Sequence, residues 1–467
     1  MDYNEMYQRV KRKACVLGNL SVEGLGRTQE AVVSRELSGL KDASSLEELK
    51  DVLLDATDNL KQLDIFDVVE VRMNAGEQRE GQADTADISV KVKESNLLKL
   101  HAGSYVNQNS EGSLEASVTV KNYLGWAERT EASFEYGSQN SNEYCLSYFQ
   151  PYFTRRTNQV QARVFHSRQN NQRHCSFTED MNGASVTVSS KDGQHELTAD
   201  GGWQEISDRA KTASQAIRQQ LGYRNRLTAS YVWKQQYLIE PDEEGLPYGI
   251  AGLKSTSQLG AVAPMGGAVG FAKQVLSGMV MLPLSDTSDL TFSAKAGLLI
   301  PLGGQPDASS TCITDRFFLG GTSTLRGFRT RGIGPTDARR IVPKTSSDSE
   351  ESAISGPPIA RDALGGDLMC SVLAELNFKL PHPALQALGV KGHVFVNGGN
   401  IMLIHGDNPV KERLQEFAST FRVAMGAGVY IPTMMGRFEM NYCRVLTSQV
   451  NDRPKHGLQF GFMSGFL

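Results

Sequence analysis

From residue 97 to the end of the chain, apolar and polar side chains alternate at every second position. The clearest apolar faces are formed by Leu114, Ala116, Val118 and Val120; by Thr130, Ala132, Phe134 and Tyr136; by Leu290, Phe292, Ala294, Ala296 and Leu298; by Phe421, Val423, Met425, Ala427 and Val429; and by Leu458, Phe460 and Phe462. Alternation of this kind is typical of β-strands with one apolar face and one polar face. No run of about 18 uncharged apolar residues occurs, which excludes a helical membrane protein.

This periodicity alone does not separate a soluble β-sandwich from a transmembrane β-barrel. Taken alone, the mean hydropathy of −0.33 favours a soluble protein. A barrel strand, however, needs only ~10 residues and keeps one face polar, so low mean hydropathy is compatible with a barrel. About 370 residues follow the first ninety-odd. At ~20–25 residues for each strand and its connection, they predict an antiparallel transmembrane β-barrel of about sixteen strands.

The first ninety-odd residues have a different pattern, because apolar residues recur there at helical spacing. We expect a strand over 14–22, a turn ending at Thr28 as a helix N-cap, and a helix over 31–40. Ser44 and Ser45 cap a second helix over 46–63, which precedes strands over 68–73 and 86–92. The predicted organisation is an N-terminal tail over 1–12, a small α+β domain over 13–95 and a barrel over 97–467. A long polar, serine-rich insertion near 343–362 interrupts the barrel.

Charge and motifs exclude several classes of function. The formal net charge is −4, so no basic field for nucleic acid is present. The six cysteines are far apart without metal-ligand spacing, and we expect reduced thiols and no metal site. No HExxH pair or GxSxG elbow occurs, so neither an enzyme nor a cofactor is expected. The N-terminus has no apolar signal segment, which favours delivery from the cytosol unless the chain is already processed.

One segment departs from the strand pattern. Residues 315–328 contain three phenylalanines, yet they are too rich in glycine and charge for a strand. Such a loop favours a partly buried position, where Arg326 needs an acidic partner. Its end, Leu325, Arg326, Gly327 and Phe328, resembles the (V/I)RGF motif of the BamA-type outer-membrane assembly superfamily. In that family the sixth loop carries this motif and folds back into the barrel lumen.

The resemblance extends to two later segments. Glu375 matches the glutamate that pairs with the loop arginine in the family, and a bidentate guanidinium–carboxylate pair suits this role. Asn397 stands where bacterial members carry an aspartate that also meets the arginine. The resemblance therefore implies a neutral hydrogen bond from Asn397, and a loop held by a single charge pair between Arg326 and Glu375. Mitochondrial members share the asparagine.

The first domain resembles a POTRA domain, whose familiar turn matches residues 24–28. A single copy favours the mitochondrial branch, the central barrel subunits of the sorting and assembly machinery (SAM). The resemblance implies a core subunit that folds β-barrel precursors and inserts them into the mitochondrial outer membrane. It also implies a POTRA domain in the intermembrane space. The implied partners are unfolded β-barrel precursors, peripheral metaxin-like SAM subunits and the lipid bilayer.

Barrel closure requires the first strand, near 98–107, to pair with the last, near 457–467. Glycines weaken a strand interior, so those of the last strand indicate either a seam that opens or ordinary barrel curvature. An open seam exposes a strand edge that accepts another strand, and the resemblance implies such a lateral gate. The predicted gate and C-terminal signal residues are Lys455, Gly457, Leu458, Phe460, Gly461 and Gly465.

Two alternatives remain open at this point. A passive solute pore of an outer membrane would need neither the first domain nor the loop motif. A polypeptide-translocating channel, of plastid or bacterial type, would share both features. Location in mitochondria, plastids or a bacterial envelope would separate these functions.

Overall fold

The computed structural model describes residues 14–76, 84–106, 111–154, 158–240, 247–264, 269–302, 311–340, 361–404, 410–433 and 436–464. The expected tail over 1–12, most of the insertion near 343–362, and Gly465 lie outside these ranges. The chain divides into two compact units. Unit 1 comprises Met1–Ala102, Ala116–Ser133 and Cys145–Arg163, and unit 2 comprises Gly103–Glu115, Phe134–Tyr144 and Val164–Leu467.

Unit 1 contains a three-stranded sheet with two α-helices. Its elements are β1 (Cys15–Glu23), α2 (Glu30–Glu36), the 3-10 helix η1 (Leu37–Lys41), α3 (Leu46–Gln62), β2 (Phe66–Ala75) and β3 (Asp84–Glu94). The sheet order is β1-β3-β2, with β1 parallel and β2 antiparallel to β3. The apolar stripe of α3 buries Leu49, Leu53 and Leu60 in the core of this unit. The Ser45 side chain caps α3 by accepting a hydrogen bond from the backbone N–H of Glu48.

The expected N-cap at Thr28 is wrong, because α2 begins at Glu30 with Gln29 as its N-cap. Thr28 instead donates its hydroxyl to Glu94 Oε1 at 2.6 Å. The Glu94 carboxylate also accepts the backbone N–H groups of Gly26, Arg27 and Thr28 at 2.8–3.1 Å. Burial alone would raise the pKa of Glu94, but these hydrogen bonds outweigh it and lower the pKa to about 2. A side chain at the end of β3 therefore fixes the turn before α2.

Unit 1 also contains the turn between β5 and β6. Asn122 in this turn donates its side-chain amide to Thr28 Oγ1 at 2.8 Å. The backbone N–H of Gln29 donates to the carbonyl of Gly125 at 2.9 Å. The Lys121 ammonium forms an ion pair with Asp64. These contacts join the small sheet-and-helix domain to one turn within the same unit.

The large sheet contains sixteen strands, which confirms the number predicted from the length of this region. The strands are β4 (Leu98–Val106), β5 (Gly112–Lys121), β6 (Arg129–Gly137), β7 (Asn142–Thr154), β8 (Asn158–Asn170), β9 (Thr178–Ser190), β10 (His195–Ser207), β11 (Gly222–Ile239), β12 (Gly249–Pro264), β13 (Val269–Ser285), β14 (Ser288–Leu302), β17 (Leu368–Lys379), β18 (Lys391–Met402), β19 (Arg422–Thr433), β20 (Gly436–Thr447) and β21 (Gly457–Ser464). Each strand neighbours the next one in this series, so β4 and β21 lie at the two ends of the order.

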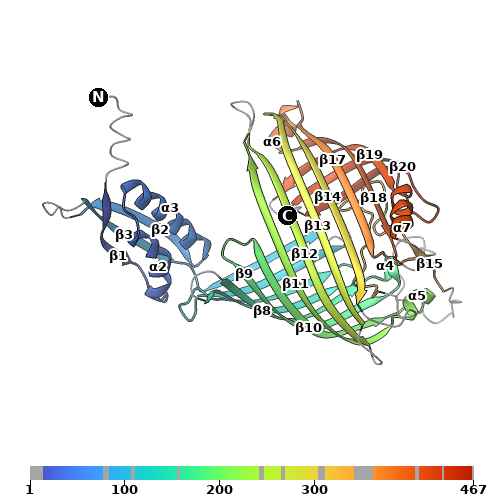
Figure 1. Ribbon diagram of the computed structural model, residues 1–467, viewed down its shortest axis with the longest axis horizontal. Helices are drawn as coiled ribbons and strands as arrows, with labels where there is room; N and C mark the ends of the chain where they lie inside the picture. The colour runs from blue at the N-terminus through green and yellow to red at the C-terminus, as the bar shows by residue number, and fades with distance from the viewer. Residues whose placement is uncertain are drawn as a thin grey trace. The chain divides into compact units, whose positions relative to one another are not determined.

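The sheet forms a β-barrel with two contrasting faces, and Figure 1 shows its long, tilted strands curling round. Large apolar side chains of the alternating pattern point outward and are exposed, including Leu114, Leu259 and Phe460. Their polar neighbours point inward, as Ser113 and Gln459 do, and are buried. An exposed apolar belt with a polar interior is the surface that a transmembrane barrel presents to lipid. Within the described ranges, no helix is long and apolar enough to cross a membrane.

The remaining elements lie in the connections between barrel strands. They are α4 (Gln172–Cys175), α5 (Gln215–Arg218), β15 (Thr336–Ala338), β16 (Arg361–Ala363), α6 (Pro383–Ala387) and α7 (Val410–Ser419). The strands β15 and β16 pair antiparallel within the long connection between β14 and β17. This connection also contains residues 311–340, which we call the anchored loop.

Candidate functional site

The anchored loop packs on the inner face of the barrel. Its side chains Phe317, Leu319, Leu325 and Phe328 form one buried apolar cluster with Val262, Phe271, Leu299, Met369, Ile401 and Ala424 of the strands. Gly327 has φ +90°, and a Cβ there would lie 2.8 Å from the Ala424 Cβ, so the chain can approach β19 closely only with glycine. The loop is therefore fixed against the wall where the sequence motif occurs.

Arg326 meets two carboxylates. Its Nε and Nη2 donate to the two oxygens of Glu439 on β20, at 3.2 and 2.8 Å. Its Nη1 donates to Glu375 Oε2 on β17 at 3.2 Å. The guanidinium also lies over the Phe395 ring, 4.5 Å from the centroid. Arg326 is 2% exposed, so these contacts form in a desolvated site, where a planar fork orients the loop strongly.

Further charged groups balance this site. Arg437 donates to Glu375 Oε2 at 2.8 Å and lies 3.6 Å from Glu439 Oε2. His393 Nδ1 lies 2.6 Å from Glu375 Oε1. We call Arg326, Glu375, His393, Arg437 and Glu439 the Arg326 cluster. Two guanidinium groups thus face two carboxylates, and this balance offsets the cost of burying each charge.

The expectation of a single charge pair is wrong, since Glu439 supplies a second carboxylate. Asn397 does contact the loop, but its Nδ2 donates to the backbone carbonyl of Arg326 at 3.2 Å. Bacterial members of the family carry the second acid at the position of Asn397 on β18, whereas here Glu439 lies on β20, two strands further along. The alternation over 436–447 could have found it, because Arg437, Glu439 and Asn441 share the polar face of that strand.

The loop motif is also bound to the last strand through its main chain. The N–H of Gly327 donates to Gln459 Oε1 at 3.0 Å, and Gln459 Nε2 donates to the carbonyl of Phe328 at 3.3 Å. The backbone N–H of Lys455 donates to the carbonyl of Gly327 at 2.7 Å. Gln459 was not identified from the sequence, although it lies on the polar face between Leu458 and Phe460. These bonds position β21 and the loop relative to one another.

The other predicted gate residues occupy different environments. Leu458 and Phe460 point outward and are 56% and 69% exposed. Gly457 has φ +91°, so its backbone conformation favours glycine. Gly461 faces the anchored loop, and a Cβ there would lie 2.4 Å from the Thr322 Cβ. The glycine at 461 therefore has a packing reason, namely room for the loop.

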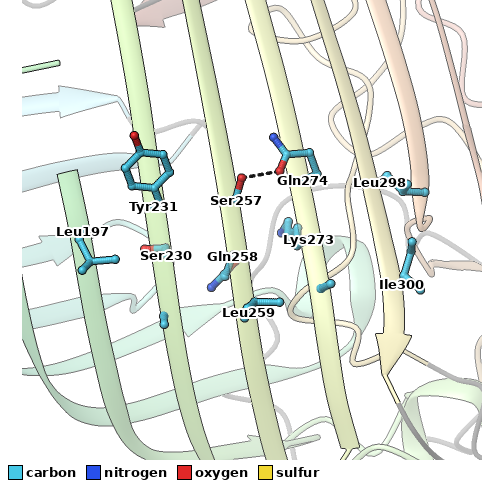
Figure 2. Close-up of a pocket in the computed structure, with 12 residues that line it drawn as sticks. Leu197, Ser230, Tyr231, Ser257, Gln258, Leu259, Lys273, Gln274, Leu298 and Ile300 are labelled. Carbon is cyan, nitrogen blue, oxygen red and sulfur yellow. Dashed lines mark hydrogen bonds between the residues drawn. The ribbon is translucent and has the colours of Figure 1, made fainter. Parts of the chain in front are cut away.

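A separate shallow pocket lies on the outer face, across β10 to β14 (Figure 2). Its volume is about 300 Å³. The large outward side chains that line it are Leu197, Tyr231, Leu259, Leu298 and Ile300. At its centre the Ser257 hydroxyl donates to Gln274 Oε1 at 2.5 Å. Since these side chains point away from the lumen, the pocket belongs to the lipid-facing surface and not to the anchored loop.

Among the residues that the structure describes, no three His, Cys, Asp or Glu side chains are placed to hold a metal ion. The Arg326 cluster instead has the properties of a structural clamp. Its ion pairs and hydrogen bonds connect the loop to β17 and β20. The neighbouring Gly327 connects the loop to β21 through Gln459.

Comparisons with known proteins agree with this arrangement. A family model described as the Omp85 superfamily domain matches residues 122–466. The chain is 29% identical to sorting and assembly machinery component 50 homolog B of Xenopus laevis, and 28% identical to the homolog of Homo sapiens. Each alignment covers 98% of this chain and 92% of the relative.

Solved structures show the same fold at lower identity. BamA from Haemophilus ducreyi lacking POTRA domains 1–3 has a TM-score of 0.67 at 17% identity, and the match covers 96% of this chain and 83% of that one. CdiB from Acinetobacter baumannii has a TM-score of 0.52 at 13% identity, covering 97% and 73%.

Proposed function

Because the chain belongs to the Omp85 superfamily, we propose that it folds β-barrel precursors and inserts them into the mitochondrial outer membrane. The near full-length similarity to sorting and assembly machinery component 50 homologs supports this choice within the superfamily. The proposed substrates are unfolded β-barrel precursors, and the proposed surroundings are the lipid bilayer and peripheral, metaxin-like subunits. The function requires no catalytic side chain, since strand pairing and apolar burial drive insertion.

One observation carries the proposal: the anchored loop holds the last strand of a sheet whose two ends are β4 and β21. Gln459 and Lys455 fix the inner side of β21 to the loop. The strand thus keeps its position even without a partner on its free edge. A fixed edge with unpaired N–H and C=O groups is a template for another strand.

The proposed mechanism is a lateral gate between β4 and β21. Opening of this seam exposes unsatisfied backbone groups inside lipid, where each costs several kcal/mol. A precursor strand that pairs with the edge removes this cost and gains its own backbone hydrogen bonds. Repeated additions fold the precursor at the membrane without nucleotide hydrolysis. The outward, apolar Leu458 and Phe460 keep the gate strand compatible with lipid.

We assign the first domain, residues 13–95, as a POTRA domain in the intermembrane space. Its outer strands β1 and β2 each have one edge without a partner in the three-stranded sheet. Such edges suit the binding of an extended precursor segment by β-augmentation. The contacts of Thr28 and Gln29 with the β5–β6 turn join this domain to that turn within unit 1.

A disulfide across the proposed seam tests the gate. In a cysteine-free background, Phe460→Cys is combined in turn with Leu98→Cys, Leu100→Cys, Ala102→Cys and Ser104→Cys. Pairs that crosslink on oxidation identify the register of the seam. We expect the oxidised protein to lose assembly of newly imported porin, and reduction to restore it, because pairing with a precursor needs a free edge.

The matched control is a disulfide between Leu276→Cys and Ala296→Cys, which face each other on the paired strands β13 and β14. This crosslink should leave assembly unchanged. Normal porin assembly by the seam-locked protein would disprove the lateral gate, and a change in solute uptake alone would favour a passive pore.

A further inference from the structure

Three lysines form one row on the inner wall of the barrel. Lys234 on β11 is directly opposite Lys254 on β12. Lys254 is opposite Ser277 on β13, which is opposite Lys295 on β14. We call Lys234, Lys254 and Lys295 the lysine row. The row crosses four neighbouring strands, so at ~4.8 Å for each strand it spans about 14 Å.

The register places the row in the lumen. Glu375 points inward to Arg326 and is opposite Thr291 on β14. Lys295 follows Thr291 by four residues on the same strand and therefore shares its inward face. Cross-strand partners share a face as well, which places Ser277, Lys254 and Lys234 on the inner wall in turn.

The row carries an excess of positive charge. Directly opposed like charges, as in the Lys234–Lys254 pair, destabilise a sheet unless an anion neutralises them. Among the described residues, none of the three ammonium groups lies in an ion pair with a carboxylate. The inner faces of β10 to β14 hold the residues within two register positions of the lysine row. Glu196 is the single carboxylate among those that the structure describes. One acid against three lysines leaves a net positive wall.

Other cations of the same wall show the contrast. Arg226 pairs with Asp315 of the anchored loop at 2.6 Å. Lys273 donates to the backbone carbonyl of Asp315 at 2.7 Å. These two groups are therefore occupied in holding the loop. Lys234 and Lys295, by comparison, are exposed to the lumen.

We propose that the lysine row binds an acidic, extended polypeptide segment inside the barrel. The length of the row exceeds the reach of a single carboxylate, whereas acids on alternate residues of a strand are ~6.6 Å apart and can meet several lysines. If the proposed function holds, the occupant is the polar face of a precursor strand, whose acidic residues are to face its own lumen. The row thus adds a charge preference to the choice of substrate.

Binding to the purified full-length chain in detergent tests the proposal. The probe is a fluorescent ten-residue oligoglutamate, followed by anisotropy at low salt. We expect the triple variant Lys234→Gln/Lys254→Gln/Lys295→Gln to bind it at least tenfold more weakly, and added salt to weaken binding to the unaltered protein. The same positions changed to arginine should keep the affinity, because the charges remain.

The control triple Lys50→Gln/Lys61→Gln/Lys93→Gln removes the same net charge from the first domain and should keep the affinity. A heat-dependent shift in gel mobility verifies that each variant is a folded barrel. Equal affinity of the lumenal triple and the unaltered protein would refute the proposal, as would an equal loss in the control. Competition by citrate at the same concentration as the peptide would overturn it in favour of small anions. Since no precursor is assembled in this assay, its outcome is independent of the proposed function.

Discussion

At the scale of single residues, Arg326 is a buried cation whose charge is met by Glu375 and Glu439. Arg437 lies close to both acids, and the four charges balance. Removal of one partner from a buried pair leaves the other charge uncompensated, at a typical cost of about 3–5 kcal/mol. The clamp therefore depends on every member, and its charge balance explains why a desolvated arginine is tolerated within the loop motif.

Glu439→Gln should impair the clamp more than Glu375→Gln. Glu439 accepts two hydrogen bonds from Arg326. Glu375 accepts only one from Arg326, and its oxygens also contact Arg437 and His393. We expect assembly of imported porin to fall at least tenfold with Glu439→Gln and several-fold with Glu375→Gln. The control Asp289→Asn alters an acid of the same inner wall outside the cluster. A larger effect of Glu375→Gln would contradict the assignment of Glu439 as the main partner.

Glu94 predicts a pH dependence of the first domain. Its pKa is lowered to about 2, compared with about 4.3 for an unperturbed glutamate. Because the folded-state pKa is the lower one, its stabilisation is present above about pH 4 and is lost as the pH falls toward 2. Chemical unfolding of the helices, followed by circular dichroism at a series of pH values, should show the free energy of unfolding falling as the pH is lowered. Glu94→Gln should make this dependence on pH shallower. A Glu70→Gln control should retain it. The same slope in both variants would contradict the role of Glu94.

At the scale of elements, the anchored loop and β21 are bound to each other and are expected to move together. Main-chain bonds from Gly327 and Phe328 reach Gln459, and Gly461 leaves room for Thr322. The loop therefore supports the inner side of the strand that also forms an end of the sheet. A displacement of the loop should be transmitted to the proposed gate without any change in the strand's own sequence.

Gly461→Val should displace the loop from β21, because even a Cβ at this position comes within 2.1 Å of the Thr322 hydroxyl. We expect slower porin assembly and faster proteolysis of the loop. Thr322→Gly should partly rescue Gly461→Val by removing the clashing side chain. Gly278→Val is the matched control, since a Cβ there would meet its nearest neighbour at 3.8 Å. Failure of rescue, with the control unchanged, would show that Gly461 acts through something other than the loop.

The strands could be predicted better than the site. The length of the region predicted about sixteen strands, and the alternation of apolar and polar residues predicted their two faces, since one face must meet lipid and the other the lumen. The N-cap of α2 was predicted wrongly at Thr28, because the Thr28 hydroxyl donates to Glu94, a partner far away in the sequence. Glu439 was missed for the same reason: its polar face was readable, but its contact with Arg326 joins residues 113 positions apart.

At the scale of the whole molecule, the fold supplies a barrel with a clamp inside and two strands at the ends of its sheet. The anchored loop fixes β21 from the lumen side through Gly327 and Gln459, and the lysine row gives another part of that lumen a positive wall. Together these features suit a protein that receives a strand, not one that passes only small solutes. The two functions therefore differ in whether the protein speeds the folding of another polypeptide.

The most direct test is therefore reconstitution of the full chain in liposomes, followed by addition of a mitochondrial porin unfolded in urea. The fraction of porin that becomes folded and protease-resistant is measured over time. We predict that it rises several-fold faster than in empty liposomes, and that Arg326→Ala returns the rate to that of empty liposomes. Equal rates with and without the protein, in liposomes that have become permeable to small sugars, would contradict the account and identify a passive channel.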